Sequence, residues 1–397
     1  MKLYAGKIYW SRTKSSEMKF KKVDRNIDTD VLIVGAGMSG SLCAYVLSLS
    51  GIKVTVVERG KIGYGSSAAN TGMLQYSNDK KLSDFVRDIG EEKAVLFYKM
   101  CLEAMDKLTE IVSNLEEETD YILRDSINYA SVKKDRDILL KDFEYLSKYG
   151  FPAEFIDGEE LKEKYAVDKA AALRTWHDAE VNPYKLIQAL TKKNIEQGVV
   201  YYEKTEVDID RIADEKAVTA DGYNIDFTSI ILTTGYTKIY PIIKDKCTTN
   251  RTYAFASYPM EEAPWKDKVM LWETRIPYLY FRSTADNRII GGGLDEGINE
   301  VEYDENKIKE KTRKIAGEIE KIFPQLKIDI QYSWSALFYG SADGLPFIGR
   351  DPKNPNKYYL LGYEGNGTCY SVAGAYILKD LIKRKHNIYE EILRVDR

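Results

Sequence analysis

Residues 28–60, DTDVLIVGAGMSGSLCAYVLSLSGIKVTVVERG, decide the fold, because three closely spaced glycines separate two apolar runs. The first run, VLIV, is uncharged and mostly β-branched, which predicts a parallel strand buried on both faces. Gly35, Gly37 and Gly40 follow with the spacing G-x-G-x-x-G, and residues 41–49 are predicted to form a helix. The stretch therefore predicts a strand–turn–helix unit of the kind that binds a dinucleotide.

The glycines and the residues between them have distinct physical roles in such a unit. Gly35 allows the tight turn, Gly37 lets a pyrophosphate approach the backbone, and Gly40 lets the helix pack closely on the strand. Met38 and Ser39 lie where the helix is predicted to begin. The N-terminus of that helix offers free N–H groups and the positive end of its dipole to phosphates.

An acidic residue ends the second predicted strand. The run VTVV at residues 54–57 is followed by Glu58 and Arg59. A carboxylate at this place can accept hydrogen bonds from ribose hydroxyls and would repel a 2′-phosphate, which argues against NADP. A glycine turn that serves only strand–helix packing is the alternative, but the strand, the helix and the acid together favour nucleotide binding.

Composition excludes several classes of protein. The 397 residues exceed what one compact core needs, and a net charge of −4 with mixed signs predicts no nucleic-acid partner. No apolar run approaches the roughly twenty residues of a membrane span. Four scattered cysteines and only two histidines predict no metal site, and they favour a reducing, cytoplasmic location. The polar residues 1–27 do not resemble a signal peptide.

The remaining elements suggest β-α-β pieces at the start, middle and end of the chain, with an antiparallel sheet inserted between them. We expect a helical region at 81–118, helices at 183–197, 304–323 and 370–384, strands at 199–207 and 229–236, and two strands that meet at 285–287.

Five motifs occur in one order along residues 28–385. They are VGAGMSG with Glu58, GYGSSAANTGML (63–74), ILTTGY (231–236), RSTADNRIIGGG (282–293), and DGLPFIGR with GYEGNGTCYSVAG near the C-terminus. In this order they resemble the D-amino-acid oxidase-like superfamily of FAD-dependent oxidoreductases, which includes glycine oxidase, sarcosine oxidase and amine dehydrogenases. A second dinucleotide fingerprint and a reactive cysteine pair are both missing from the sequence, so electrons are expected to come from an organic substrate.

The resemblance implies an α/β Rossmann-like FAD-binding domain that is discontinuous, with an inserted α+β substrate domain on a mostly antiparallel sheet. The FAD-binding domain would comprise residues 28–80, 165–240 and 340–397. The substrate domain would comprise residues 81–164 and 241–339, and residues 1–27 would be an N-terminal extension.

The resemblance also implies how FAD is held. The first unit would bind the ADP half, the serine-rich loop would follow the pyrophosphate and flavin, and the glycine turn before the last helix would face the pyrimidine edge of the flavin. Backbone N–H groups there would stabilise negative charge on the reduced ring. Because the positions used for covalent attachment lack cysteine and histidine, FAD is expected to be non-covalent. The expected FAD-binding residues are Gly35, Gly37, Met38, Ser39, Gly40, Glu58, Arg59, Ser66, Ser67, Asn70, Gly72, Met73, Val207, Thr234, Gly235, Asp343, Gly344, Gly365, Asn366, Gly367 and Thr368.

The substrate site departs from the family pattern. Phe338 stands where relatives place an arginine that binds the substrate carboxylate, so Arg282 is the replacement candidate. Arg282 alternates with Tyr278 and Tyr280 on one predicted strand, and Tyr280 could contribute to an aromatic cage for an amine. His177 could take a proton from an ammonium substrate. The alternatives without a catalytic role are that the arginine lies on the surface, that the tyrosines only pack in the protein, and that the histidine is exposed.

The expected reaction is oxidation of a C–N bond in a small-molecule amine or amino acid, with hydride transfer from the substrate carbon to flavin N5. The electron acceptor could be oxygen, a quinone or a protein. Oxidation of a hydroxy acid or another C–OH substrate is the alternative within enzymes. A non-catalytic flavin-binding protein is the alternative outside them.

Overall fold

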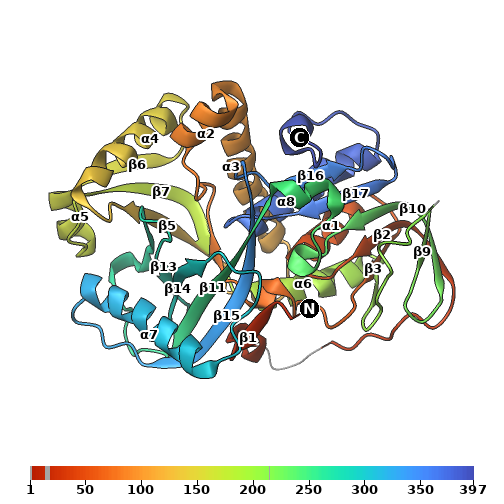
Figure 1. Cartoon of the computed structure of the whole chain (residues 1–397), viewed down its shortest axis with the longest axis horizontal. Helices are drawn as coiled ribbons and strands as arrows, with labels where there is room; N and C mark the ends of the chain where they lie inside the picture. Colours follow the sequence, from red (N-terminus) through yellow and green to blue (C-terminus); the bar gives the residue numbers. More distant parts are fainter. Residues whose placement is uncertain (1, 14–17, 214) are drawn as a thin grey trace.

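The described residues of the computed structural model, 2–13, 18–213 and 215–397, form two sheets that lie beside each other (Figure 1). Helices cover both sheets, and the C-terminus lies on the side of the first sheet, which is drawn at the right. Among these residues, no helix is long and apolar enough to cross a membrane.

The first sheet has seven strands in the described chain. Their order is β16 (Phe347–Arg350), β17 (Lys357–Leu361), β10 (Asn224–Leu232), β2 (Ile27–Val34), β3 (Val54–Val57) and β8 (Val200–Tyr202), and β9 (Lys216–Val218) pairs with β10. Strands β17, β10, β2, β3 and β8 are mutually parallel. The predicted strand–turn–helix unit lies at the centre of this sheet, where β2 pairs with β10 and β3.

Residues 31–34, the second half of strand β2, are buried on both faces, as their uncharged sequence predicts. Val31 and Ile33 belong to the core that helices share with one face of the sheet, whereas Leu32 and Val34 belong to a second core on the opposite face. The alternation follows from the two-residue period of a strand. The helices on the first face are α1 (Met38–Ser48), α6 (Pro183–Glu196) and α8 (Gly367–Ile382), and α3 (Glu91–Ser113) packs on α8.

The second sheet is mostly antiparallel and has ten strands in the described chain. Its order is β1 (Tyr4–Gly6), β15 (Ile330–Ser341), β11 (Cys247–Ser257), β14 (Ile289–Glu296), β13 (Tyr280–Ser283), β12 (Met270–Glu273), β5 (Ile122–Tyr129), β7 (Ala171–Glu180) and β4 (Met73–Leu74), with β6 (Ala153–Asp157) on β7. The amphipathic helix α7 (Glu305–Ile322) packs on β11, β14 and β15. The other helices are α2 (Leu82–Ile89), α4 (Arg136–Lys148), α5 (Gly158–Tyr165) and α9 (Glu390–Leu393).

Three details differ from the sequence-based expectations. The helical region at 81–118 is two helices, α2 and α3, because Gly90 adopts a φ of +84° between them. Strand β7, inside the predicted nucleotide segment 165–240, belongs to the second sheet. Strand β1 also joins that sheet, by pairing with β15, so part of the N-terminal extension is built into the fold.

Candidate active site

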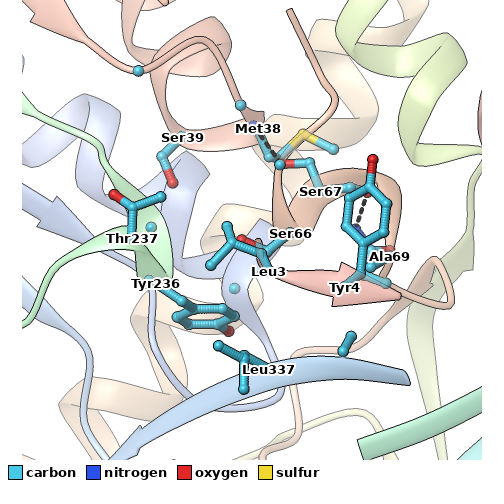
Figure 2. Close-up of a pocket in the computed structure, with 18 of the residues that line it drawn as sticks. Leu3, Tyr4, Met38, Ser39, Ser66, Ser67, Ala69, Tyr236, Thr237 and Leu337 are labelled. Carbon is cyan, nitrogen blue, oxygen red and sulfur yellow. Dashed lines mark hydrogen bonds between the residues drawn. The ribbon is translucent and has the colours of Figure 1, made fainter. Parts of the chain in front are cut away.

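A cavity of about 1170 Å³ lies where the two sheets approach each other. Its walls come from the glycine turn before α1, the end of β3, the loop at 63–75, the end of β10, the turn before α8, and strands β1, β13 and β15. Its volume exceeds the range of about 300–1000 Å³ that is typical of small-ligand pockets. Figure 2 shows part of this wall, where Leu3 and Tyr4 of the N-terminal segment, Ser66 and Tyr236 lie around one space.

The glycine turn leaves no room for side chains. A Cβ at Gly40 would lie 1.9 Å from the carbonyl oxygen of Gly35, and one at Gly37 would lie 2.9 Å from Ser67 Oγ. Gly35 has a φ of +111°, a region that other residues rarely adopt. Gly37, the residue before α1, offers no side-chain cap, and the Met38 N–H donates to Ser67 Oγ, so the next N–H groups of the first turn are the ones that can face an anion in the cavity. This geometry fits a pyrophosphate.

Glu58 ties the end of β3 to the glycine turn. Its Oε2 atom accepts a hydrogen bond from the Ala36 N–H at 3.0 Å, and its Oε1 atom accepts one from the Gly60 N–H at 2.8 Å. Burial raises the pKa of Glu58, although these two N–H groups and Arg59 oppose the rise. Glu58 and Arg59 both line the cavity, and a contact with ribose stays a prediction.

The serine-rich loop is held in shape mainly by side chains that bond to backbone. Ser67 Oγ accepts the Met38 N–H at 3.0 Å, which joins the loop to α1. The Asn70 side chain donates to the Ser67 carbonyl at 2.9 Å and accepts the Gly72 N–H at 2.8 Å. Ser66, Ser67, Asn70, Gly72 and Met73 all line the cavity.

Two tryptophans donate hydrogen bonds to backbone carbonyl oxygens of the same loop. Trp10 Nε1 donates to the Asn70 carbonyl at 2.6 Å, and Trp334 Nε1 donates to the Ala69 carbonyl at 2.9 Å. Trp10 belongs to the N-terminal segment and is almost fully buried. The first residues of the chain therefore help to shape the loop that lines the cavity.

Arg282 lies outside the cavity and is 1% exposed. Its guanidinium donates to the carbonyl oxygens of Thr71 at 2.8 Å, Val181 at 2.8 Å and Ser283 at 2.9 Å, and Glu180 lies 3.6 Å away. The structure thus gives Arg282 a structural role behind the serine-rich loop, in place of the predicted contact with a substrate carboxylate. The alternation of side chains along β13 could not reveal this role, because it does not say which face of the strand packs against the serine-rich loop.

His177 is also separate from the cavity. It is exposed, with a φ of +69°, and its Nδ1 atom lies 3.0 Å from Asp106 Oδ1. It does not line the cavity, so the predicted proton transfer has no support from its position.

The other predicted cofactor residues divide into two groups. Val207, Thr234 and Gly235 line the cavity near the end of β10. Asp343 and Gly344 do not: Asp343 pairs with Arg397 at 2.8 Å, and Gly344 packs beside Phe85. In this structure their motif contacts the C-terminal residue Arg397 and Phe85 of α2, and the position of these two residues gives no support to their predicted contact with the cofactor.

The turn before α8 forms a second uncapped helix N-terminus at the cavity. Gly365, Asn366, Gly367 and Thr368 all line it, and α8 begins at Gly367 without a side-chain cap. The Asn366 side chain instead donates to the Ser77 carbonyl at 2.5 Å. The backbone N–H groups at this turn can stabilise negative charge, which suits the pyrimidine edge of a flavin.

Aromatic rings line the part of the cavity next to β12 and β13. The ring centres of Trp272 and Tyr278 are 6.2 Å apart, and those of Tyr278 and Tyr280 are 5.6 Å apart. A Cβ at Gly292 would lie 2.3 Å from Tyr280 Oη, so the glycine makes room for the Tyr280 side chain. The predicted residue Tyr280 does line the cavity.

The sequence analysis did not identify Asp79, Asp295 and Glu364, three carboxylates that line the cavity. Asp79 accepts a hydrogen bond from Tyr278 Oη at 2.7 Å. Burial raises the pKa of Asp79, that of Asp295 to about 6 and that of Glu364 to about 7. Asp79 and Glu364 are near recognised motifs, but isolated acids are too common in sequences to stand out.

The fold and the cavity are those of an α/β dinucleotide-binding protein. The second sheet closes the part of the cavity next to β12 and β13, which is called the substrate region below. The profile of the family described as FAD dependent oxidoreductase matches residues 30–381. The chain belongs to this family, so it is an FAD-dependent oxidoreductase. The predicted family resemblance, fold class and FAD cofactor are thereby confirmed, whereas the contact of each residue with FAD stays a prediction.

Individual relatives agree with the family. Gamma-glutamylputrescine oxidoreductase of Escherichia coli (strain K12) is 26% identical over 388 residues, covering 93% of this chain and 87% of the relative. The crystal structure of glycine oxidase from Geobacillus kaustophilus has a TM-score of 0.77 at 19% identity, covering 94% of this chain and 99% of that one. That of L-proline dehydrogenase from P. horikoshii has a TM-score of 0.76 at 20% identity, covering 94% and 98%.

Proposed function

We propose that the protein oxidises a C–N bond of an amine or amino acid. The observation that carries the proposal is the lining of the substrate region, where aromatic rings and carboxylates surround a space beside the turn before α8. Such a lining suits an amine, because rings and carboxylates both attract its positive charge. The names of the relatives, which include an oxidoreductase of a putrescine derivative and a proline dehydrogenase, agree with this chemistry.

FAD bound in this cavity would supply the two-electron oxidation, and the chain itself would supply binding, orientation and electrostatics. The uncapped N-termini of α1 and α8 would stabilise negative charge at two places along the cofactor. The residues Trp272, Tyr278 and Tyr280 would limit where a substrate can lie and would exclude water from it.

Oxidation of a hydroxyl group is less compatible with the cavity. Such a substrate needs a base for its hydroxyl proton; His177, the predicted base, does not line the cavity, so Asp295 or Glu364 would have to take its place. A hydroxy acid would also bring a carboxylate towards Asp79, Asp295 and Glu364, which repel it when they are ionised.

The direct test is the visible spectrum of the purified protein during anaerobic additions of amines, amino acids and hydroxy acids. We expect a flavin spectrum that bleaches with an amine or amino acid. Bleaching with hydroxy acids only would replace the proposed reaction. A flavin that no compound bleaches would favour a non-catalytic flavin-binding protein. Release of the flavin on acid precipitation would support its predicted non-covalent binding.

A further inference from the structure

We propose that the substrate binds as a cationic amine without a carboxylate group, and that Asp295 is the carboxylate that pairs with its positive charge and takes the one proton that the ammonium loses before a hydride leaves the neighbouring carbon. This inference rests on the proposed function and names the substrate class of the same site. It depends on three features of the cavity: unpaired polar atoms, the placement of charge, and the aromatic rings.

The substrate region contains polar atoms that the protein leaves unpaired. Gln75 Nε2, Thr252 Oγ1 and Asp295 Oδ1 are buried and make no hydrogen bond of good geometry with the described residues, although the Thr252 hydroxyl is close enough to Asp295 to lower its pKa. All three residues line the cavity. An unpaired buried polar group costs about 1–3 kcal/mol, so such groups are rare unless a ligand pairs with them. Gln75 Nε2 is a donor that needs an acceptor, Asp295 Oδ1 needs a donor, and the Thr252 hydroxyl can act as either, so their presence on one cavity indicates a polar ligand with at least one donor for Asp295.

The charge on these walls selects a cation. Asp79 has Tyr278 as a hydrogen-bond donor, and the charge of Lys81 favours its ionised form. Asp295 has no ion pair with a lysine or arginine within the part of the chain that the structure describes. Asp295 is thus the carboxylate that most needs a positive partner.

The basic residues of the cavity lie mainly elsewhere. Arg59 and Lys61 follow β3, and Lys238, which pairs with Asp210, follows β10, so these three belong to the nucleotide end. The exposed Lys2 precedes β1. None of the four offers the planar, buried guanidinium that binds a carboxylate with two hydrogen bonds.

The aromatic rings reinforce the preference for a cation. The ammonium of Lys81 already lies 5.3 Å from the ring centre of Trp272, which shows that this ring accommodates positive charge. Tyr278 and Tyr280 continue the same aromatic surface towards the cavity. The faces of these rings are electron-rich and attract a desolvated ammonium.

The position expected to hold an arginine is occupied by Phe338, which lines the cavity, and Arg282 is committed to backbone carbonyls. The carboxylate of an α-amino acid would therefore find no matched partner, and it would approach the unpaired Asp295. Like charges in a partly desolvated site disfavour binding strongly.

The first experiment compares compounds that differ by one carboxylate. The FAD-loaded protein is titrated anaerobically with cadaverine and lysine, phenethylamine and phenylalanine, and pyrrolidine and proline, and flavin bleaching is recorded. We expect the carboxylate-free member to bleach the flavin at least about tenfold faster in any active pair. Faster bleaching by the amino acids would overturn this inference and leave the proposed function intact.

The second experiment measures binding without turnover. Tetramethylammonium and benzoate are titrated into the FAD-loaded protein, and perturbation of the flavin absorbance gives each dissociation constant. We expect tetramethylammonium to bind more tightly than benzoate, and Asp295→Asn to weaken it about tenfold. The control is Asp286→Asn, the same change in an exposed residue that pairs with Arg288 on the β13–β14 hairpin, outside the cavity.

These outcomes separate the two proposals. Tighter binding of benzoate, or equal tetramethylammonium affinity in wild type and Asp295→Asn, would overturn the inference. A protein that binds tetramethylammonium through Asp295 but is bleached by no compound would keep the binding site and reject the proposed oxidation. Thermal unfolding of both variants shows whether any loss of binding comes from misfolding.

Discussion

The two ends of the cavity differ in how completely the chain pairs its own polar groups. At the nucleotide end, both carboxylate oxygens of Glu58 accept hydrogen bonds from backbone N–H groups. The Asn70 side chain bonds to the Ser67 carbonyl and to the Gly72 N–H. At the substrate end, Thr252 and Asp295 contribute buried oxygens without partners. The comparison teaches that the nucleotide end is organised to hold its backbone in one shape. The substrate end leaves specific groups for a ligand.

The largest expected effect is on the nucleotide end. Gly37→Val should abolish FAD binding, because a Cβ at this position would already lie 2.9 Å from Ser67 Oγ and two further methyl groups would enter the cavity. The measurement is the ratio of flavin absorbance to protein after purification. The control is Gly317→Ala in α7, where a Cβ would meet no atom within 4 Å. Normal FAD content in Gly37→Val would show that the predicted pyrophosphate contact is wrong.

The next effect concerns Arg282, the buried cation behind the serine-rich loop. Arg282→Met should lower the free energy of unfolding by about 3–5 kcal/mol, because the carbonyl oxygens of Thr71, Val181 and Ser283 would lose their donor and the buried Glu180 would keep only its pair with Arg124. Denaturant unfolding gives this value. The control is Arg275→Met. Arg275 lies in the chain segment just before β13, but it is exposed and pairs with Glu273, so its substitution should lower the free energy of unfolding by less. A weaker substrate affinity with unchanged stability would instead restore Arg282 as a substrate ligand.

A smaller effect should appear in the pH dependence of stability. Burial and the charge of Asp79 raise the pKa of Asp295 from 3.8 to about 6, while the nearby Thr252 hydroxyl opposes the rise. The folded state therefore binds this proton more tightly than the unfolded state, and Asp295 makes the stability of the FAD-free protein fall as the pH rises from about 4 to about 6.

Asp295→Asn should remove that decrease. The FAD-free variant should be more stable than the wild type by on the order of 2 kcal/mol at pH 8, and the difference should vanish below about pH 4. Denaturant unfolding across this pH range measures it. A variant less stable at pH 8 would mean that Asp295 has a protein partner and is not reserved for a ligand.

The smallest effect is expected at His177. His177→Asn should change the rate of substrate oxidation by less than about twofold and stability by less than about 1 kcal/mol, because only an exposed ion pair with Asp106 is lost. Asparagine is chosen because it tolerates the positive φ at this position. A large loss of oxidation with alcohols but not with amines would favour the C–OH alternative.

The nucleotide unit could be predicted from sequence because its causes are local. The spacing of Gly35, Gly37 and Gly40 restricts the backbone directly, and the uncharged run before them fits only a strand buried on both faces. The same holds for the turn at Gly365 and Gly367, where α8 begins. In each case, residues within about ten positions determine the geometry. Gly35, Gly37, Gly365 and Gly367 line one cavity, whereas Gly40 packs against Gly35 and does not line it.

The substrate end could not be predicted in the same way, because it depends on contacts between distant segments. Asp79, Tyr278 and Asp295 come from separate parts of the chain and meet only when β13 and β14 pack beside the loop after β4. Arg282 and Asp343 illustrate the opposite error: both belong to motifs matched by sequence, yet tertiary packing directs them away from the cavity.

The sequence by itself thus determined the dinucleotide-binding unit, since glycine spacing and strand burial constrain the backbone locally. The resemblance of five motifs in order indicated the family and, through it, the FAD cofactor. Only the tertiary structure decided which charged side chains are paired within the protein and which face the cavity. The physical reason is that the partner of a buried charge is set by the packing of distant segments: Arg282 and Thr71 are 211 residues apart, and Asp79 and Tyr278 are 199 apart.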